Sequence, residues 1–234
     1  MTEDAMEQLP GGYTLALSDG AFPLSTDSMV LAHFVKLPKS ANILDLGAGC
    51  GTLGLLLCAG DPHCHVTGLE ITGQAHGAAL ENIQRNHLES RLESICADLR
   101  AVPKEFAPGC FSCCVSNPPY FSGGPASRTL PLARREDCCT PEELFRSAAW
   151  ALRYGGDFFL VHKPEKLAQL ITCGAACGLE AKRLRLVRHK EGGPITLILL
   201  QFRKGGKPGL QIEERCLYDS HGDPTGYYRE VYHI

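Results

Sequence analysis

Apolar and polar positions along this chain form two kinds of segment, and their order predicts an α/β fold. Short apolar runs that read as buried strands lie at residues 43–46, 65–69, 91–97, 111–115 and 157–161. Segments with apolar residues at helical spacing lie between or after them, at about residues 52–58, 74–87, 141–152 and 164–178. Strands that alternate with helices favour a parallel sheet with helices on both faces.

The beginning of the chain adds a small extension to this core. A Gly11-Gly12 turn before the alternating residues 13–17 predicts a β-hairpin. Thr26, Asp27 or Ser28 can then cap a helix that runs to about Val35.

The end of the chain adds an antiparallel pair. Residues 182–188 and 195–202 read as strands, and the short Gly-Gly-Pro turn between them requires that they run in opposite directions. We therefore expect a Rossmann-like, seven-stranded mixed sheet whose last strand is antiparallel. The expected organisation is a single domain over residues 1–234, with 1–38 as a hairpin and helix extension and 39–234 as the catalytic core.

Composition narrows the class of protein. The chain has 234 residues, is 44% hydrophobic and carries a net charge of -3, so no overall basic field indicates nucleic acid. No apolar run approaches the about 18 residues that span a bilayer. The 12 cysteines are scattered, and Cys110 and Cys113 have no second pair at zinc-finger spacing. We expect reduced thiols, no metal site, no membrane contact and a cytoplasmic protein.

A glycine-rich turn follows the first core strand. Gly47-Ala48-Gly49-Cys50-Gly51 leads into an apolar helix, and glycines at such a turn let backbone N–H groups approach a ligand. Glu70 ends the next strand about 20 residues later, where a carboxylate can accept both hydroxyls of a ribose. The turn lacks the Gly-x-Gly-x-x-Gly spacing of dinucleotide sites, which favours S-adenosylmethionine.

Asp98 ends the third strand and has two possible roles. Its carboxylate can accept a hydrogen bond from an adenine amine, or it can cap a turn or a helix. Its place after Glu70 favours the adenine contact.

The sequence Ser-Asn-Pro-Pro-Tyr at residues 116–120 is the strongest chemical signal in the chain. The prolines end a buried strand and leave Asn117 at its carboxyl end, where ligands bind in open α/β sheets. The side-chain oxygen of Asn117 and the carbonyl of Pro118 can each accept one N–H of a planar amine, while Tyr120 offers a stacking face. The competing interpretation is an ordinary Asn-Pro turn.

Two further stretches carry positive charge. Residues 121–135 form a long segment beside the proposed site, which favours a binding loop. Arg183, Arg185 and Arg188 follow one predicted strand, with His189, Lys190, Arg203, Lys204 and Lys207 close in sequence. They read either as charges that protect an exposed sheet edge or as a phosphate-binding patch.

With these features together, the whole chain resembles class I S-adenosylmethionine-dependent methyltransferases, and within them the bacterial tRNA (valine) adenine-N6 methyltransferase family. The resemblance includes residues 26–28, 45–51, 117–120 and the tail 226–230. It implies a tRNA partner, glycines that hold the methionine end of the cofactor, Glu70 on the ribose and Asp98 on the adenine. Arg135 departs from the family, in which histidine is common at this position.

The residues and the resemblance together define three groups. We assign to the cofactor site Asp27, Asp45, Gly47, Ala48, Gly49, Gly51, Glu70, Ile71, Asp98 and Asn117. The residues assigned to catalysis are Asn117, Pro118, Pro119 and Tyr120. The residues assigned to substrate binding are Tyr120, Phe121, Arg128, Arg134 and Arg135.

Three alternative functions use the same scaffold. A protein glutamine-N5 methyltransferase of the release-factor type shares the tetrapeptide, because an amide NH₂ presents the same two hydrogens, but the segment before Asp45 leaves no room for the helical domain of those relatives. DNA adenine methylation is disfavoured because no target-recognition domain is visible in the sequence. A non-catalytic RNA-binding module would not need both Asn117 and Glu70.

Overall fold

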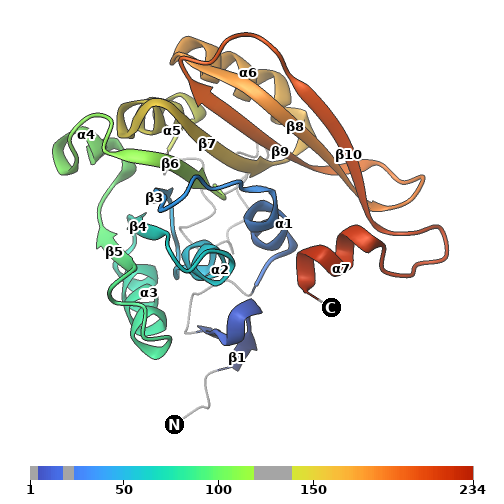
Figure 1. The fold of residues 1–234 in the computed structure, drawn as a ribbon, viewed down its shortest axis with the longest axis horizontal. Helices are drawn as coiled ribbons and strands as arrows, with labels where there is room; N and C mark the ends of the chain where they lie inside the picture. Colours follow the sequence, from blue (N-terminus) through green and yellow to red (C-terminus); the bar gives the residue numbers. More distant parts are fainter. Residues whose placement is uncertain (1–4, 18–23, 119–138, 234) are drawn as a thin grey trace, which may run out of the picture.

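The structure is a computed structural model, and it describes residues 5–17, 24–118 and 139–233 (Figure 1). A mixed sheet of eight strands has the spatial order β10-β8-β9-β7-β6-β3-β4-β5. These strands are β3 (Asn42–Leu46), β4 (His65–Glu70), β5 (Leu92–Cys96), β6 (Phe111–Ser116), β7 (Leu152–His162), β8 (Leu179–Lys190), β9 (Ile195–Lys204) and β10 (Gln211–Tyr218).

Only β9 runs against its neighbours among these eight strands. It pairs antiparallel with β7 and with β8, while every other pairing in the sheet is parallel. The carboxyl ends of seven strands therefore meet at one edge, which is where the glycine turn, Glu70, Asp98 and Asn117 follow their strands.

The α/β class and the antiparallel pair are confirmed, but the sheet has eight strands where the sequence predicts seven. The added strand, β10, pairs parallel with β8. It lies at the sheet's edge and is exposed or half-buried along most of its length, so its residues do not need the continuous apolar run of a buried strand, and that pattern is absent from its sequence.

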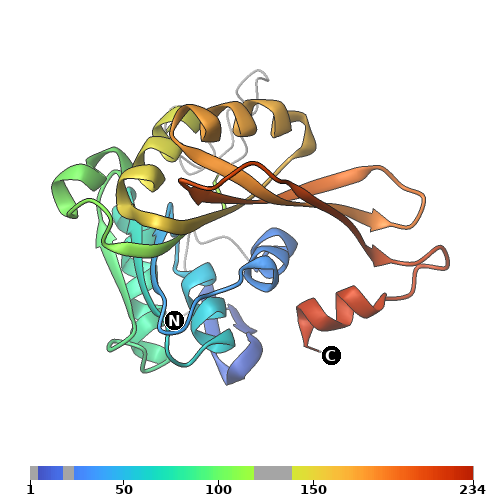
Figure 2. The ribbon, with the colours of Figure 1, turned by 45° about the horizontal axis from the view of Figure 1, so that its top comes forward.

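Helices cover both faces of the sheet, as Figure 2 shows. One hydrophobic cluster joins the sheet to α1 (Thr26–Phe34), α2 (Thr52–Gly60), α3 (Gly73–Arg85) and α7 (Gly226–Tyr232). The cluster on the other face joins it to α4 (Val102–Glu105), α5 (Pro141–Ala151) and α6 (Leu167–Ala176). None of the helices in the described ranges combines the length and the apolar composition that crossing a bilayer requires.

Helix ends follow the capping rules with two differences from the sequence prediction. Thr140 and Glu143 form the expected capping box of α5. The cap of α1 is Ser25, whose Oγ accepts the Ser28 N–H, and not residues 26–28. Helix α5 ends at Ala151, where β7 begins, before the Gly155-Gly156 pair that the sequence favours as its end.

The predicted hairpin is present and is tied to the core by asparagines. β1 (Ala5–Gln8) and β2 (Thr14–Leu17) pair antiparallel across a short 3₁₀ turn (Pro10–Gly12). Asn82, which is buried on α3, accepts the Ala16 N–H at 2.8 Å and donates to the Cys50 carbonyl at 3.1 Å. One amide thus connects the extension to the glycine turn.

The cysteines of the described ranges are free thiols, as the sequence predicts. Seven of these eleven cysteines are buried, and a buried thiol acts as a small apolar side chain.

Candidate active site

The glycine turn adopts a backbone that side chains other than glycine tolerate poorly. Gly47, Gly49 and Gly51 have φ angles of 82°, 58° and 86°. A Cβ on Gly47 or Gly49 would meet no atom of the described chain within 4 Å, so the turn presents open backbone. Gly51 is the N-cap of α2, so the turn also offers the positive end of a helix.

The turn is held against β4. The N–H groups of Gly47 and Ala48 both donate to the Leu69 carbonyl, at 3.0 and 2.9 Å. A side chain at Gly68 would lie 2.8 Å from the Ala48 Cβ, so β4 needs a glycine there for this close approach.

Glu70 is a buried carboxylate aimed at the same turn. Its Oε2 accepts the Gly49 N–H at 2.9 Å, and its Oε1 accepts the Thr72 N–H and hydroxyl, both at 2.8 Å. A carboxylate has about four acceptor positions, and these bonds use both positions of Oε1 and one of Oε2. Glu70 is therefore fixed in place, and its Oε2 can still accept a hydrogen bond from a ligand hydroxyl. Ile71, which follows it, is 44% exposed and offers an apolar surface beside the carboxylate.

Asp45 is a second buried carboxyl under the turn. Burial, helped by the charge of Glu70, raises the pKa of Asp45 to about 7. Its Oδ2 has no hydrogen-bond partner among the described residues. An unpaired buried acceptor next to another carboxylate is suited to a positively charged ligand.

Asn117 is anchored by α1, from a part of the chain that lies 89 residues away. Its Nδ2 donates to Ser28 Oγ at 3.0 Å, and Ser28 Oγ also accepts from Ser25 Oγ at 3.2 Å. Because Ser28 acts as the acceptor, the amide nitrogen of Asn117 faces the helix and its oxygen faces away. The sequence predicts residues 26–28 as possible helix caps and Asp27 as a cofactor contact. It gives no signal for the contact between Ser28 and Asn117, because the two residues lie 89 positions apart.

Asp27 lies on the first turn of α1, one residue before Ser28. Burial raises the pKa of its carboxyl, and the positive charge of Lys163 partly offsets this effect. Thr26 accepts a hydrogen bond from the Tyr232 hydroxyl at 3.1 Å. The start of α1 is therefore held by the C-terminal helix.

In this structure Asp98 caps a turn, which is the second of the two roles that its sequence position allows. It caps a short 3₁₀ turn (Leu99–Ala101) by accepting the Arg100 N–H, and it also pairs with the Arg100 guanidinium. Hydrogen bonding from the Arg100 side chain lowers the pKa of Asp98. An adenine contact at Asp98 stays a prediction, and it would share the carboxylate with Arg100.

Several predicted residues lie outside the described ranges: Pro119, Tyr120, Phe121, Arg128, Arg134 and Arg135. Their roles in catalysis and substrate binding stay predictions. Pro118 is described and lies directly after Asn117, beyond the end of β6.

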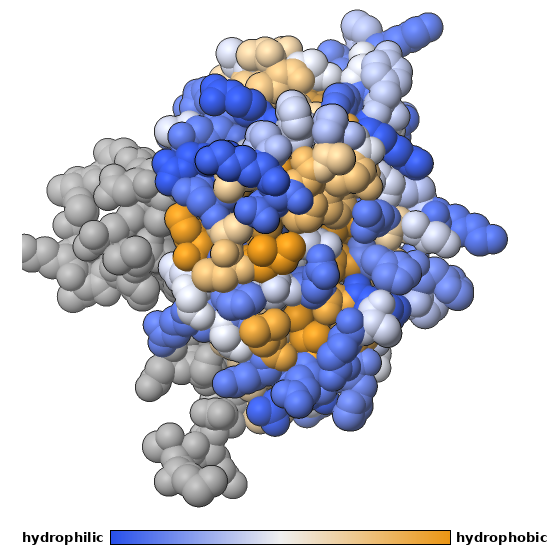
Figure 3. Space-filling view, turned by 90° about the vertical axis from the view of Figure 1, so that its left-hand side faces the viewer, coloured by the Kyte–Doolittle hydropathy of each residue, from blue (hydrophilic) through white to orange (hydrophobic). Residues whose placement is uncertain are grey.

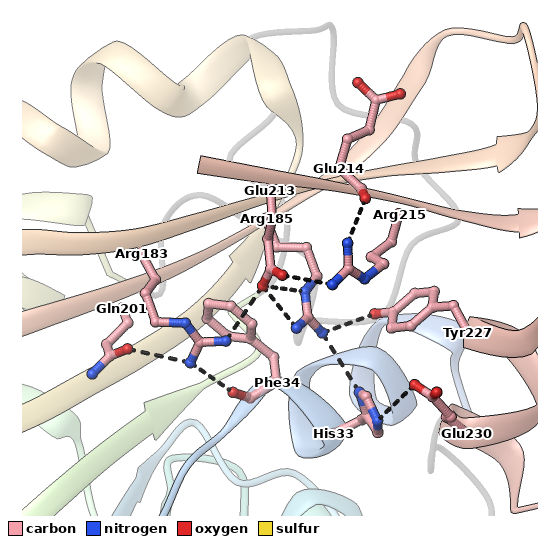
Figure 4. Close-up of polar contacts among 10 residues, drawn as sticks. All are labelled: His33, Phe34, Arg183, Arg185, Gln201, Glu213, Glu214, Arg215, Tyr227 and Glu230. Carbon is pink, nitrogen blue, oxygen red and sulfur yellow. Dashed lines mark hydrogen bonds and ion pairs between the residues drawn. The ribbon is translucent and has the colours of Figure 1, made fainter. Parts of the chain in front are cut away.

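The arginines of β8 are not a free patch, and both interpretations of them were wrong for Arg183 and Arg185. β10 covers this side of β8, and Glu213 on β10 accepts from both guanidinium groups, at 3.4 Å and 2.8 Å (Figure 4). Arg183 also lies over the Phe34 ring, with its Cζ 4.3 Å from the ring centroid. These arginines join β10 to the end of α1 and are not available to phosphates.

Glu213 is the shared acceptor of this arginine cluster. Burial acts to raise the pKa of Glu213, but the hydrogen bond and charge of Arg185 outweigh burial, and the pKa is lowered. Arg215 adds a third positive partner at 2.9 Å. Arg188 is separate and pairs with Glu214 near the surface.

No group of three or more His, Cys, Asp or Glu side chains in the described part of the chain is arranged to hold a metal ion.

Comparison with known proteins places the chain among methyltransferases. Residues 23–172 match the family described as Methyltransferase small domain. A protein of Bacteroides fragilis (strain YCH46), named tRNA1(Val) (adenine(37)-N6)-methyltransferase, is 33% identical over 78% of this chain and 77% of its own. A protein of the same name from Photobacterium profundum is 28% identical over 84% of each chain.

Solved structures show the same fold. The crystal structure of a protein from Agrobacterium tumefaciens, described as a predicted O-methyltransferase, aligns with a TM-score of 0.75 and 20% identity. The alignment covers 89% of this chain and 96% of that one.

S-adenosylmethionine is the cofactor that these matches imply, and the site fits it. The open glycine backbone and Asp45 suit its positively charged methionine end, and Glu70 Oε2 keeps an acceptor position for a ribose hydroxyl. Exposed Ile71 can cover a face of the adenine. The sequence predicted each of these residues, and the structure brings Asp45, Glu70 and the turn together.

Proposed function

Because this chain belongs to the Methyltransferase small domain family and to the family of the tRNA1(Val) (adenine(37)-N6)-methyltransferases, we propose that it methylates the exocyclic N6 of an adenine in tRNA. That it is a class I S-adenosylmethionine-dependent methyltransferase is the established part of this statement. The target nitrogen and the tRNA partner are the proposed part. A cytoplasmic location stays a prediction that accompanies a tRNA substrate.

The observation that carries the proposal is the direction of the Asn117 amide. Its Nδ2 is bonded to Ser28, so Oδ1 remains as an acceptor at the carboxyl edge, close in sequence to the Pro118 carbonyl. Two acceptors suit an NH₂ group, which presents two hydrogens. A hydroxyl or carbon nucleophile would use only one of them or none.

The chemistry follows from this arrangement. An adenine amine is a weak nucleophile because its lone pair is delocalised into the ring. Accepting both N–H bonds favours a pyramidal nitrogen whose lone pair points at the methyl group, and fixed dipoles do so without reorganisation. S-adenosylmethionine supplies an electrophilic methyl group. No strong base is required of the chain, because the methylated nitrogen loses its proton readily.

Transfer of labelled methyl groups tests the proposal directly. The purified protein, incubated with methyl-labelled S-adenosylmethionine and unfractionated tRNA, should label the tRNA, and nucleoside mass analysis should show N6-methyladenosine. Label in a release-factor protein instead of RNA would favour glutamine methylation. The absence of transfer to either would contradict the proposal.

Cofactor binding should release a proton from Asp45. The positive charge of the bound cofactor lowers the pKa of the carboxyl from about 7, so the ionised form binds more tightly. Apparent affinity should fall by about tenfold per pH unit below this pKa and level off above it, in the limit of strong coupling. Calorimetry at pH 6 in two buffers of different ionisation enthalpy measures the proton. Asp45→Asn should remove this release, and an unchanged release would assign it to another group.

Replacing Glu70 should weaken cofactor binding. Glu70→Ala removes the proposed ribose acceptor and also the hydrogen bonds that hold the Gly49 and Thr72 N–H groups. We expect the Kd for S-adenosylmethionine to rise by about 10- to 100-fold, the range for hydrogen bonds to a charged group. Glu70→Gln keeps one acceptor oxygen, so its Kd should lie between those of the unchanged protein and Glu70→Ala. An unchanged Kd in Glu70→Ala would reject the ribose contact.

A further inference from the structure

A cavity of about 440 Å³ lies on the sheet face that carries α4 and α5. It is outside the residues assigned to the cofactor. Its lining includes Arg100, Glu143, Arg146, Ser147, Trp150 and Lys204. Figure 3 views the molecule from the side of α4 and β5 and shows hydrophilic side chains grouped with apolar ones there.

Trp150 forms a fixed aromatic wall of this cavity. It is the only tryptophan of the chain and is 39% exposed. Its indole Nε1 donates to the Phe106 carbonyl at 3.1 Å, which holds the ring in one orientation. A large ring that is fixed but left partly in solvent suits stacking of a flat ligand, with little ordering cost on binding.

Positively charged side chains from three different elements line the same cavity. Arg100 follows β5, Arg146 lies on α5 and is exposed, and Lys204 ends β9. Lys204 Nζ donates to the Ala149 and Leu152 carbonyls, both at 2.7 Å, which positions its charge at the end of α5.

One negative charge lies among them. Glu143 accepts the Thr140 N–H at 2.8 Å and lies 3.8 Å from Arg100. The acid is thus partly compensated by these contacts. Asp98 offsets a second charge by pairing with Arg100. Three positive side chains against two carboxylates leave a small net positive charge, which favours an anion.

The cavity runs along α5 from the carboxyl edge of the sheet to its amino edge. At one end, Arg100 pairs with Asp98, which follows β5. At the other end, Trp150 lies beside the amino ends of β6 and β7, where its carbonyl accepts the Gly109 N–H. A ligand that reaches from the candidate active site to Trp150 must therefore be as long as β6, which an extended nucleic-acid strand can be.

We propose that this cavity binds a nucleotide of the RNA substrate that lies at a distance from the methylated one. Its base stacks on Trp150, and its phosphate pairs with Arg146. Stacking of bases on aromatic rings combined with cationic side chains is the usual mode of single-stranded nucleic-acid binding. The inference rests on the proposed function only for the identity of the RNA.

Trp150 makes the proposal directly measurable, because it is the only tryptophan. Fluorescence excited at the tryptophan band should be quenched by unfractionated tRNA, and the quenching should weaken steeply with salt. S-adenosylmethionine alone should leave the signal unchanged. Equal quenching by adenosine monophosphate at matched nucleotide concentration would show a site for free nucleotides and overturn the RNA assignment.

Matched variants separate stacking and local charge from general effects. Trp150→Ala should weaken tRNA binding by about 10- to 100-fold in a filter or anisotropy assay, while Trp150→Phe, which also loses the indole N–H, should retain most of it. Arg146→Glu should weaken binding more than Arg85→Glu, an equal change of charge at an exposed position on α3, on the opposite face. If Arg146→Glu and Arg85→Glu weaken tRNA binding equally, the effect comes from net charge alone, and the proposed site is refuted.

The outcomes also separate this inference from the proposed function. If Trp150→Ala binds tRNA more weakly but still methylates N6 at saturating tRNA, the result supports both the cavity as an RNA site and the proposed function. Unchanged binding and KM in Trp150→Ala, with active methylation, refutes the cavity and leaves the function standing. RNA that binds at Trp150 but is never methylated refutes the function and leaves the cavity.

Discussion

Replacing Asn117 with alanine should lower kcat for methyl transfer by about 10²–10³-fold, the typical cost of losing one oriented dipole at a reacting centre. The reason is that the side-chain oxygen, directed away from Ser28 by the bond at 3.0 Å, is one of the two proposed acceptors for the target amine. Single-turnover transfer of labelled methyl to tRNA measures the effect.

Controls distinguish this role from a general loss of structure. The Kd for S-adenosylmethionine and the unfolding temperature of Asn117→Ala should stay close to those of the unchanged protein. Ser28→Ala should lower kcat by less, because the amide can then rotate but is still present, and Ser28→Thr, which keeps the hydroxyl, should restore activity. Near-normal turnover in Asn117→Ala would reject the role of this residue.

Arg185→Ala should lower the free energy of unfolding by about 2–3 kcal/mol. Its side chain is only 8% exposed, lies 2.8 Å from Glu213 and contacts the Tyr227 ring of α7. Removing one partner of a buried ion pair typically costs about 3–5 kcal/mol. We expect less here because Glu213 keeps Arg183 and Arg215. Urea denaturation measures the difference.

Arg188→Ala is the matched control on the same strand. Arg188 pairs with Glu214, whose side chain is 51% exposed, and exposed ion pairs contribute little to stability. The loss in Arg185→Ala should therefore clearly exceed the loss in Arg188→Ala. Equal losses would mean that the cluster at Glu213 does not hold β10 and α7 against α1.

Local sequence was sufficient for the elements that depend on neighbouring residues. The apolar runs of β3, β4 and β6 marked buried strands, and three glycines with positive φ marked the turn before α2. The Thr140 capping box could also be predicted, because all of its atoms come from residues 140–143. These features need no partner from elsewhere in the chain, so their signal is contained in a short window.

The eighth strand could not be predicted in this way. β10 carries Glu213, Glu214 and Arg215 in succession, a pattern that reads as a solvated segment. The strand forms because its charges meet arginines that lie 26 to 30 residues earlier on β8. Read alone, those arginines indicated a free edge or a phosphate site.

What the sequence by itself determined is the α/β core, the glycine turn, Glu70 at the end of its strand and the Asn-Pro-Pro run after β6. Tertiary structure alone decided that Ser28 orients the Asn117 amide and that Arg183 and Arg185 are structural. The physical reason is range. Strand and turn formation depends on adjacent residues, whereas the direction of an amide and the availability of a charge depend on partners that folding brings together.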